Sequence, residues 1–201
     1  MFSSMKINPF YGVALSVALY IAQPAVAQTG QTSASNAMMK SMQSGMNKMM
    51  GMKMTGDPDH DFASMMRMHH QSAVEMADLQ LRQGKNARVK TLAQKIKASN
   101  QAEIKQFDQF LNRHKPQSTG SKFGQQGMAA MHSGRHSMNG NVDHDFASMM
   151  GQHHQQAVEM AQAYLKEGKV ASMKTLANNI IRQQTKEITE LKRLETQLAA
   201  R

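Results

Sequence analysis

Apolar side chains recur at three- and four-residue steps along four segments of the chain, which is the spacing of amphipathic helices. The segments are residues 62–79, 86–113, 146–166 and 170–199. Gly84 separates the first segment from the second, and Gly168 separates the third from the fourth. Glycine commonly ends a helix. Alternating, strand-like patterns are nearly absent, so the sequence predicts an all-α fold.

The second half of the chain repeats the first. A shift of 84 residues aligns residues 59–110 with residues 143–194 without a gap, and 27 of the 52 aligned positions are identical. Each copy has the pattern of a helical hairpin, which buries too little apolar surface to be stable by itself. We therefore expect the two hairpins to pack into one four-helix bundle. Two separate domains, each half of a dimer, are the alternative arrangement.

The beginning of the chain has the pattern of a secretory signal peptide. Lys6 gives a positive start, residues 9–21 form an apolar run, and Ala25 and Ala27 supply the small residues of a cleavage site. The apolar run is shorter than a membrane span requires, and an uncleaved membrane anchor is the alternative. The sequence thus predicts cleavage after Ala27, a periplasmic or secreted protein, and no stable membrane insertion after cleavage.

Five regions follow from these patterns. They are a signal peptide (1–27), a flexible Met-rich N-terminal arm (28–56), repeat one (57–114), a flexible Gly/Ser-rich linker (115–142) and repeat two (143–201).

Methionine is the outlier of the composition, because the chain has 21 Met and no Cys. Without Cys the chain can form neither a disulfide nor a thiolate metal site, whereas thioethers are soft ligands that remain available in an oxidising compartment. Flexible packing in the core is the alternative role for the methionines. The net charge of +10 is spread along the predicted helices without interleaved aromatic residues. Together with export, this spacing predicts no nucleic-acid partner.

The strongest candidate for chemistry is a Met-Met-x-x-His-His segment that occurs once in each repeat. On a helix each methionine lies one turn before a histidine, so we expect imidazole and thioether groups to converge in an apolar groove. The candidate ligands are His69, His70, Met65, Met66 and Met76 in repeat one, and His153, His154, Met149, Met150 and Met160 in repeat two. This soft, neutral set favours Cu(I) over zinc. Glu75 and Glu159 are candidates to orient the histidines, with a simple surface role as the alternative. For the histidines, the alternative is that one of each pair packs in the core, bonded to a neighbour, and that the other is solvated.

Three further sets of residues could bind metal less specifically. Residues 38–54 contain eight methionines and predict thioether capture of metal, with an amphipathic helix as the alternative. The linker set is Met128, Met131, His132, His136 and Met138. The Asp-His-Asp segments at 59–61 and 143–145 could hold Cu(II) or zinc weakly at the surface, although helix capping is sufficient to explain their aspartates.

The same residues carry a family resemblance. The chain resembles a bacterial family classified as a domain of unknown function, with the pattern D-x-x-F-x-x-x-M-x-x-H-H-x-x-A-x-x-M-A. The matching residues are Asp59, Phe62, Met66, His69, His70, Ala73, Met76 and Ala77 in repeat one, and Asp143, Phe146, Met150, His153, His154, Ala157, Met160 and Ala161 in repeat two. The resemblance extends over residues 57–198. It implies a ferritin-like four-helix bundle, Cu(I) and Ag(I) binding through the paired histidines, and a part in copper resistance as a metallochaperone or buffer.

Residues and resemblance together predict a non-catalytic protein that binds Cu(I) and Ag(I), with a copper exporter or sensor of the periplasm as a candidate partner. The alternative is a metal-free, Met-rich helical interaction protein, because flexible methionine surfaces can bind varied partners. A copper-dependent oxidase ranks lowest, because the sequence shows no open substrate site.

Overall fold

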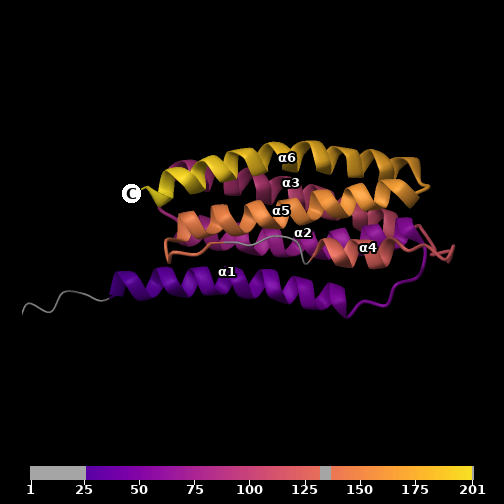
Figure 1. Ribbon diagram of the computed structural model, residues 1–201, viewed down its shortest axis with the longest axis horizontal. Helices are drawn as coiled ribbons and strands as arrows, with labels where there is room; N and C mark the ends of the chain where they lie inside the picture. The colour runs from indigo at the N-terminus through magenta and orange to yellow at the C-terminus, as the bar shows by residue number, and fades with distance from the viewer. Residues whose placement is uncertain (1–25, 132–136, 201) are drawn as a thin grey trace, which may run out of the picture.

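The computed structural model describes residues 26–131 and 137–200, and within them it contains six helices and no strand (Figure 1). The helices are α1 (Val26–Met50), α2 (Pro58–Gln83), α3 (Ala87–Leu111), α4 (Phe123–Ala130), α5 (Val142–Glu167) and α6 (Ala171–Ala199). The prediction of an all-α fold is confirmed. Nearly all of the predicted signal peptide lies outside the described residues. None of the helices in the described ranges is long and apolar enough to cross a membrane.

The four helices predicted from apolar periodicity are α2, α3, α5 and α6, and their observed ends lie within four residues of the predicted ones. Three of them begin at a side-chain cap: Asp57, Asn86 and Asn141 accept hydrogen bonds from backbone N–H groups of the first turn. Such caps satisfy donors that a helix leaves unpaired at its start. Local sequence therefore accounts for where these helices begin.

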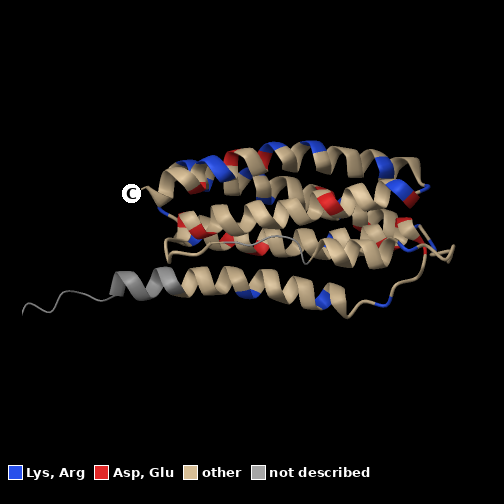
Figure 2. Ribbon diagram, in the orientation of Figure 1, with Lys and Arg blue, Asp and Glu red and all other residues tan. Residues whose placement is uncertain are grey.

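The two hairpins, α2–α3 and α5–α6, contact each other mainly through α2 and α5 (Figure 1). Helix α1 packs against α2 and α5 on the side away from α3 and α6, so α2 and α5 form the middle layer. Lysine and arginine are frequent along α6, with acidic residues between them, whereas α1 carries only Lys40 and Lys48 (Figure 2). The surface of α6 is therefore more highly charged than that of α1.

Two apolar clusters fill the interior on either side of the histidines. On α2, Met66 belongs to one cluster and Met76 to the other, and on α5, Met160 lies in the cluster of Met66 and Met149 in that of Met76. The order of the clusters is thus opposite on the two helices, which means that α2 and α5 run antiparallel. The four histidines consequently meet in the middle of both helices.

One buried aspartate of each repeat accepts hydrogen bonds from the turn between the two helices of the other repeat. Asp59 of α2 binds the turn between α5 and α6, and its donors are the hydroxyl of Tyr164 (2.5 Å) and the backbone N–H groups of Lys169 (3.1 Å) and Val170 (2.9 Å). Asp143 of α5 binds the turn between α2 and α3, and its donors are the side-chain amide of Gln80 and the backbone N–H groups of Lys85 and Asn86 (both 3.0 Å). We call these two sets of bonds the aspartate clamps.

The clamps explain why glycine ends the first helix of each hairpin. A Cβ atom at Gly84 would collide with the side chains of Gln80 and Asp143, and one at Gly168 would collide with the ring of Tyr164. Burial raises the pKa of Tyr164 well above its usual value, and the hydrogen bond to Asp59 raises it further. The phenol therefore stays protonated and serves as a donor.

The segment predicted as a flexible Met-rich arm instead forms helix α1 over most of its length. Met38 and Met49 are buried, Ser35 Oγ donates to Asp145 (2.6 Å), and Ser41 Oγ donates to Glu75 (2.7 Å). Methionine is a good helix former, and its long thioether side chain can fill an irregular interface. The prediction missed the packing of this segment on α2 and α5, because the sequence pattern does not show that contact.

The predicted flexible linker also contains regular structure, because Phe123–Ala130 form the short helix α4. Phe123 lies with its ring edge-on to the rings of Phe62 and Tyr164, at centroid distances of 6.0 and 5.9 Å. Edge-to-face aromatic contacts of this kind stabilise a core beyond simple burial. One buried aromatic residue fixes a segment that is too short to display a helical period.

Candidate metal centre

One histidine from each repeat enters a common site between α1, α2 and α5. His69 lies on α2 and His153 lies at the equivalent position on α5, and only 2% of each residue is exposed. Their ring centroids are 3.6 Å apart and their planes are inclined by 30°. Because α2 and α5 are packed antiparallel, equivalent positions near the middle of each helix meet face to face.

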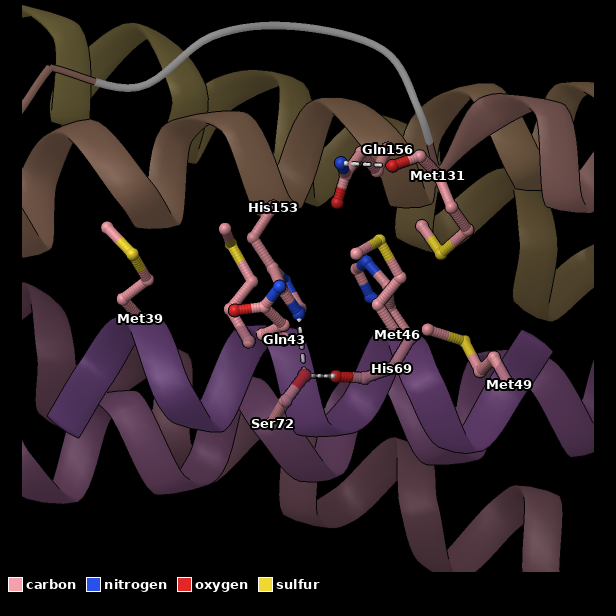
Figure 3. Close-up of a pocket in the computed structure, with 10 residues that line it drawn as sticks. Met39, Gln43, Met46, Met49, His69, Ser72, Met131, His153 and Gln156 are labelled. Atoms are coloured by element: carbon pink, nitrogen blue, oxygen red, sulfur yellow. Dashed lines mark hydrogen bonds between the residues drawn. The ribbon is translucent and has the colours of Figure 1, made fainter. Parts of the chain in front are cut away.

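The two imidazoles line a cavity of about 180 Å³ together with five methionines (Figure 3). The lining residues are Met39, Met42, Met46 and Met49 of α1, Met131, His69, His153, Gln43, Ser72 and Gln156. No carboxylate lines this cavity, so every available ligand atom is a neutral nitrogen, sulfur or oxygen. Thioether sulfur and imidazole nitrogen are the ligands that soft, monovalent copper accepts.

Ser72 determines which nitrogen of His153 is available to a ligand. The Ser72 hydroxyl donates its hydrogen to the carbonyl of His69 (2.8 Å), so it accepts at its 2.9 Å contact with Nε2 of His153. Nε2 of His153 therefore carries the proton, and Nδ1 carries the lone pair. Within the described residues, neither Nδ1 of His153 nor Nε2 of His69 has a hydrogen-bond partner.

Both imidazoles in the cavity are neutral. Burial lowers the pKa of His69 and of His153 well below the usual value of 6.5, and repulsion from the neighbouring histidines lowers it further. A side-chain hydrogen bond with Gln156 at His69, and one with the His69 backbone at His153, offset only part of this lowering of the pKa. A metal ion thus competes with few protons at neutral pH. Two buried, unpartnered nitrogen atoms next to thioethers have the chemistry of a ligand set.

The chain matches a known family model and is similar to a solved structure. A family model described as "Domain of unknown function (DUF305)" matches residues 59–195. The chain belongs to the DUF305 family. A solved structure titled "CopM in the Ag-bound form (by soaking)" is similar to this chain, with 28% sequence identity and a TM-score of 0.55. The similarity covers 69% of this chain and 95% of that one. No curated protein matches the chain.

The cavity combines residues from inside and outside the DUF305 match. His69, His153 and Met131 lie within residues 59–195, whereas the four methionines of α1 precede that range. The sequence predicts thioether capture by residues 38–54 as a site separate from the histidines. The structure instead brings four of those methionines to the histidines.

The other histidine of each pair points away from the cavity. Nε2 of His70 lies 2.7 Å from Oε2 of Glu103 on α3, and Nε2 of His154 lies 2.8 Å from Oε2 of Glu187 on α6. Consecutive residues of a helix are about 100° apart around its axis, so the two rings of a pair cannot share one face. In this structure the two histidines of a pair therefore have different neighbours, and their joint binding of a metal with the thioethers stays a prediction.

Glu103 and Glu187 take the place next to the histidines for which the sequence suggested Glu75 and Glu159. Glu75 accepts from Ser41, and Glu159 accepts from Gln155 (2.9 Å). Burial would raise the pKa of Glu187, but the contact with His154 and the hydrogen bond from Gln183 hold it below its usual value. The internal alignment contained the signal for this pair, since a shift of 84 residues places Glu103 on Glu187.

The six methionines predicted as ligands are buried, but none of them lines the cavity. Met65, Met66 and Met160 lie in one apolar cluster, and Met76, Met149 and Met150 lie in the other. Their position one or two turns from a histidine places them above and below the cavity, in the core. The alternative reading of these methionines as packing residues describes their surroundings better.

The Asp-His-Asp segments, predicted as weak surface sites for Cu(II) or zinc, are largely buried. Asp59 and Asp143 form the clamps, while Asp61 accepts from Thr55 and Asp145 accepts from Ser35 and two backbone N–H groups. Among the described residues, no group of three His, Asp or Glu side chains is arranged to hold a metal ion. The interpretation of these aspartates as caps of their own helices is wrong, because Asp57 and Asn141 cap α2 and α5. Asp59 and Asp143 instead bind the turns of the opposite repeat.

The linker set is divided by the fold. Met131 lines the cavity, and Met128 and Met138 are half-buried against the two apolar clusters. His132 and His136 lie outside the described residues.

Proposed function

We propose that this protein binds Cu(I) and Ag(I) in the cavity between α1, α2 and α5. The observation that carries the proposal is the pair of buried, unpartnered imidazole nitrogens on His69 and His153 facing five thioethers, with no carboxylate in the lining. Neutral ligands leave a buried monovalent ion with a single positive charge, which limits the cost of removing it from water. The likeness to CopM, whose structure has been determined with silver, supports the same ion class.

The wider role that we propose is a non-catalytic one in copper resistance, as a metallochaperone or buffer of the periplasm that exchanges ions with a copper exporter or sensor. The four repeat helices act as one four-helix bundle, and α1 completes the site on its surface. Methionine thioethers form weak, exchangeable bonds with Cu(I), which suits a protein that passes ions on.

The alternative of a metal-free interaction protein requires methionines on the surface. Among the described residues, Met50 is the single large hydrophobic residue that is strongly exposed, at 52%. The methionines of the cavity face inward, toward the histidines. This orientation supports the binding of an ion over the binding of a partner surface.

A competition titration with a Cu(I)-specific chelator tests the proposal. The His69→Gln/His153→Gln variant should lose at least 100-fold in Cu(I) affinity, because it removes both nitrogen ligands. The matched control is His70→Gln/His154→Gln, which changes the neighbouring pair and should alter affinity less than tenfold while circular dichroism confirms folding. Wild-type affinity in the first variant would refute the assignment of the site.

A second measurement addresses the proposed absence of catalysis. With excess Cu(I) in air, oxygen consumption above that of free Cu(I) should not exceed the number of ions bound. Sustained turnover would contradict the proposed role as a chaperone or buffer.

A further inference from the structure

The arrangement of the two rings restricts how an ion can bind. An imidazole donates a lone pair that lies in the plane of the ring, and the nitrogen–metal distance is about 2 Å. The rings of His69 and His153 are stacked at 3.6 Å with an inclination of only 30°. Their planes do not meet within about 2 Å of both nitrogens, so the two lone pairs cannot converge on one ion in this geometry.

The thioethers of α1 form a row that passes both rings. Met39, Met42, Met46 and Met49 recur at steps of three, four and three residues, which places them on one face of the helix over about 15 Å. In Figure 3, Met46 lies beside the ring of His69, with Met49 and Met131 beyond it, and Met39 lies at the opposite end of the row, beyond His153. Each ring therefore has thioethers of its own.

The two unpartnered nitrogens are chemically distinct. On His153 the lone pair is on Nδ1, because Nε2 donates to Ser72. On His69 the nitrogen without a partner is Nε2. A polar atom buried without a hydrogen bond is costly, and each of the two stacked rings has one such atom in the cavity's ligand set.

We propose that the cavity holds two monovalent ions, one bound in the plane of each of the two stacked rings. One ion binds Nδ1 of His153 and thioethers from Met39 and Met42, and the other binds Nε2 of His69 and thioethers from Met46, Met49 and Met131. This inference rests on the proposed function and adds the number of ions and the division of the ligands. Because two positive charges repel in a buried cavity, the second ion should bind about tenfold or more weakly than the first.

The experiment is a titration of the full, apo protein, labelled with ¹⁵N at histidine, with Ag(I). Silver nuclei couple to a directly bound ¹⁵N nucleus, so each ring nitrogen reports its own ion. At saturation we expect coupling at Nε2 of His69 and at Nδ1 of His153, and two ions more in native mass spectra than the His69→Gln/His153→Gln variant retains. Each single His→Gln variant should lose one ion and keep the coupling at the other ring.

Two matched controls isolate the cavity. Met50→Leu removes an exposed thioether outside the lining, and His70→Gln changes the neighbouring imidazole, so both should keep the two ions. If His69→Gln fails to fold, Met46→Leu/Met49→Leu provides the test at nearly constant volume. That variant should weaken Ag(I) binding at His69 by at least tenfold and leave the signal of His153 in place.

The outcomes separate this inference from the proposed function. If one equivalent of Ag(I) saturates both ring signals, and either single variant abolishes both, the ion is shared and the two-ion proposal is overturned, while the proposed function stands. If neither ring nitrogen responds to Ag(I), and the double variant binds as many ions as the wild type, the proposed function fails as well.

Discussion

The two repeats differ least where they contact each other. Asp59 and Asp143 occupy equivalent positions and each binds the turn of the opposite repeat. His69 and His153 are equivalent and stack on each other, and Glu103 and Glu187 are equivalent and lie beside equivalent histidines. Both repeats make these contacts with equivalent residues, so the same side chains are required at these positions in both copies.

The repeats differ more where they face segments that occur only once. Ser72 lies against Gly45 of α1, whereas its counterpart Gln156 donates to the carbonyl of Met131 (2.9 Å). The two copies therefore share a scaffold, and the single-copy segments distinguish the two sides of the cavity. Duplication supplied the paired imidazoles, and α1 and the linker supplied the thioethers around them.

The largest effect is expected at the aspartate clamps. Asp59→Ala and Asp143→Ala each leave three donors without an acceptor, one of them on a buried side chain, so each should lower the free energy of unfolding by about 3 kcal/mol. Urea denaturation measures this loss. The control is Asp78→Ala, which removes a half-buried ion pair with Lys97 and should cost less than about 1 kcal/mol. Clamp variants no less stable than Asp78→Ala would show that the repeats do not depend on each other.

Acidification tests whether the two stacked histidines are equivalent. The folded-state pKa of each lies well below 6.5, so below pH 6.5 the unfolded chain binds more protons than the folded one. Stability of the apo protein should then fall with pH by up to about 1.4 kcal/mol per histidine for each pH unit, until the folded-state pKa is reached. Urea midpoints between pH 7.5 and 5 measure this slope.

Single His69→Gln and His153→Gln variants should each remove a similar part of that slope. The low pKa also predicts that Ag(I) affinity holds to a lower pH than the 6.5 of an exposed histidine. A slope unchanged in both variants would mean that other groups are responsible.

The contact between α1 and the first repeat should affect metal binding more than folding. A Cβ atom at Gly45 would lie 3.0 Å from Cβ and Oγ of Ser72, so Gly45→Val should displace α1 and its thioethers. We expect about a tenfold loss of Ag(I) affinity, or about 1.4 kcal/mol. The matched control is Gly151→Val, because the nearest atom to a Cβ there is Cβ of Leu191 at 3.9 Å. Equal affinities in the two variants would argue against α1 as a source of ligands.

The smallest change in stability is expected when one side-chain donor of an aspartate clamp is removed. Tyr164→Phe removes one hydrogen bond to Asp59 and should cost about 1 kcal/mol. Gln80→Met removes the equivalent bond to Asp143, but it also removes the buried Oε1 of Gln80, which has no partner among the described residues. Its cost should therefore be smaller, as thermal unfolding of both variants can show. A larger loss in Gln80→Met would reverse this ranking.

The helices of the repeats could be predicted because helical order is encoded locally. The stripe from Val89 to Leu111 gave the extent of α3 to within about two residues, and the 84-residue shift gave its counterpart α6. Apolar period, capping residues and a terminal glycine are all properties of neighbouring positions along the chain. They do not depend on what the helix packs against.

The side chains that each histidine contacts could not be predicted in the same way. The motif places His69 and His70 side by side in the sequence, but the packing of α2 between α5 and α3 sends one ring to His153 and the other to Glu103. Likewise, nothing local to Met39 or Met46 indicates that they lie over those rings. The sequence by itself determined the helices, the duplication and the soft ligand types. Only the tertiary structure decided which candidate ligands share a cavity, because contacts between helices depend on faces far apart along the chain.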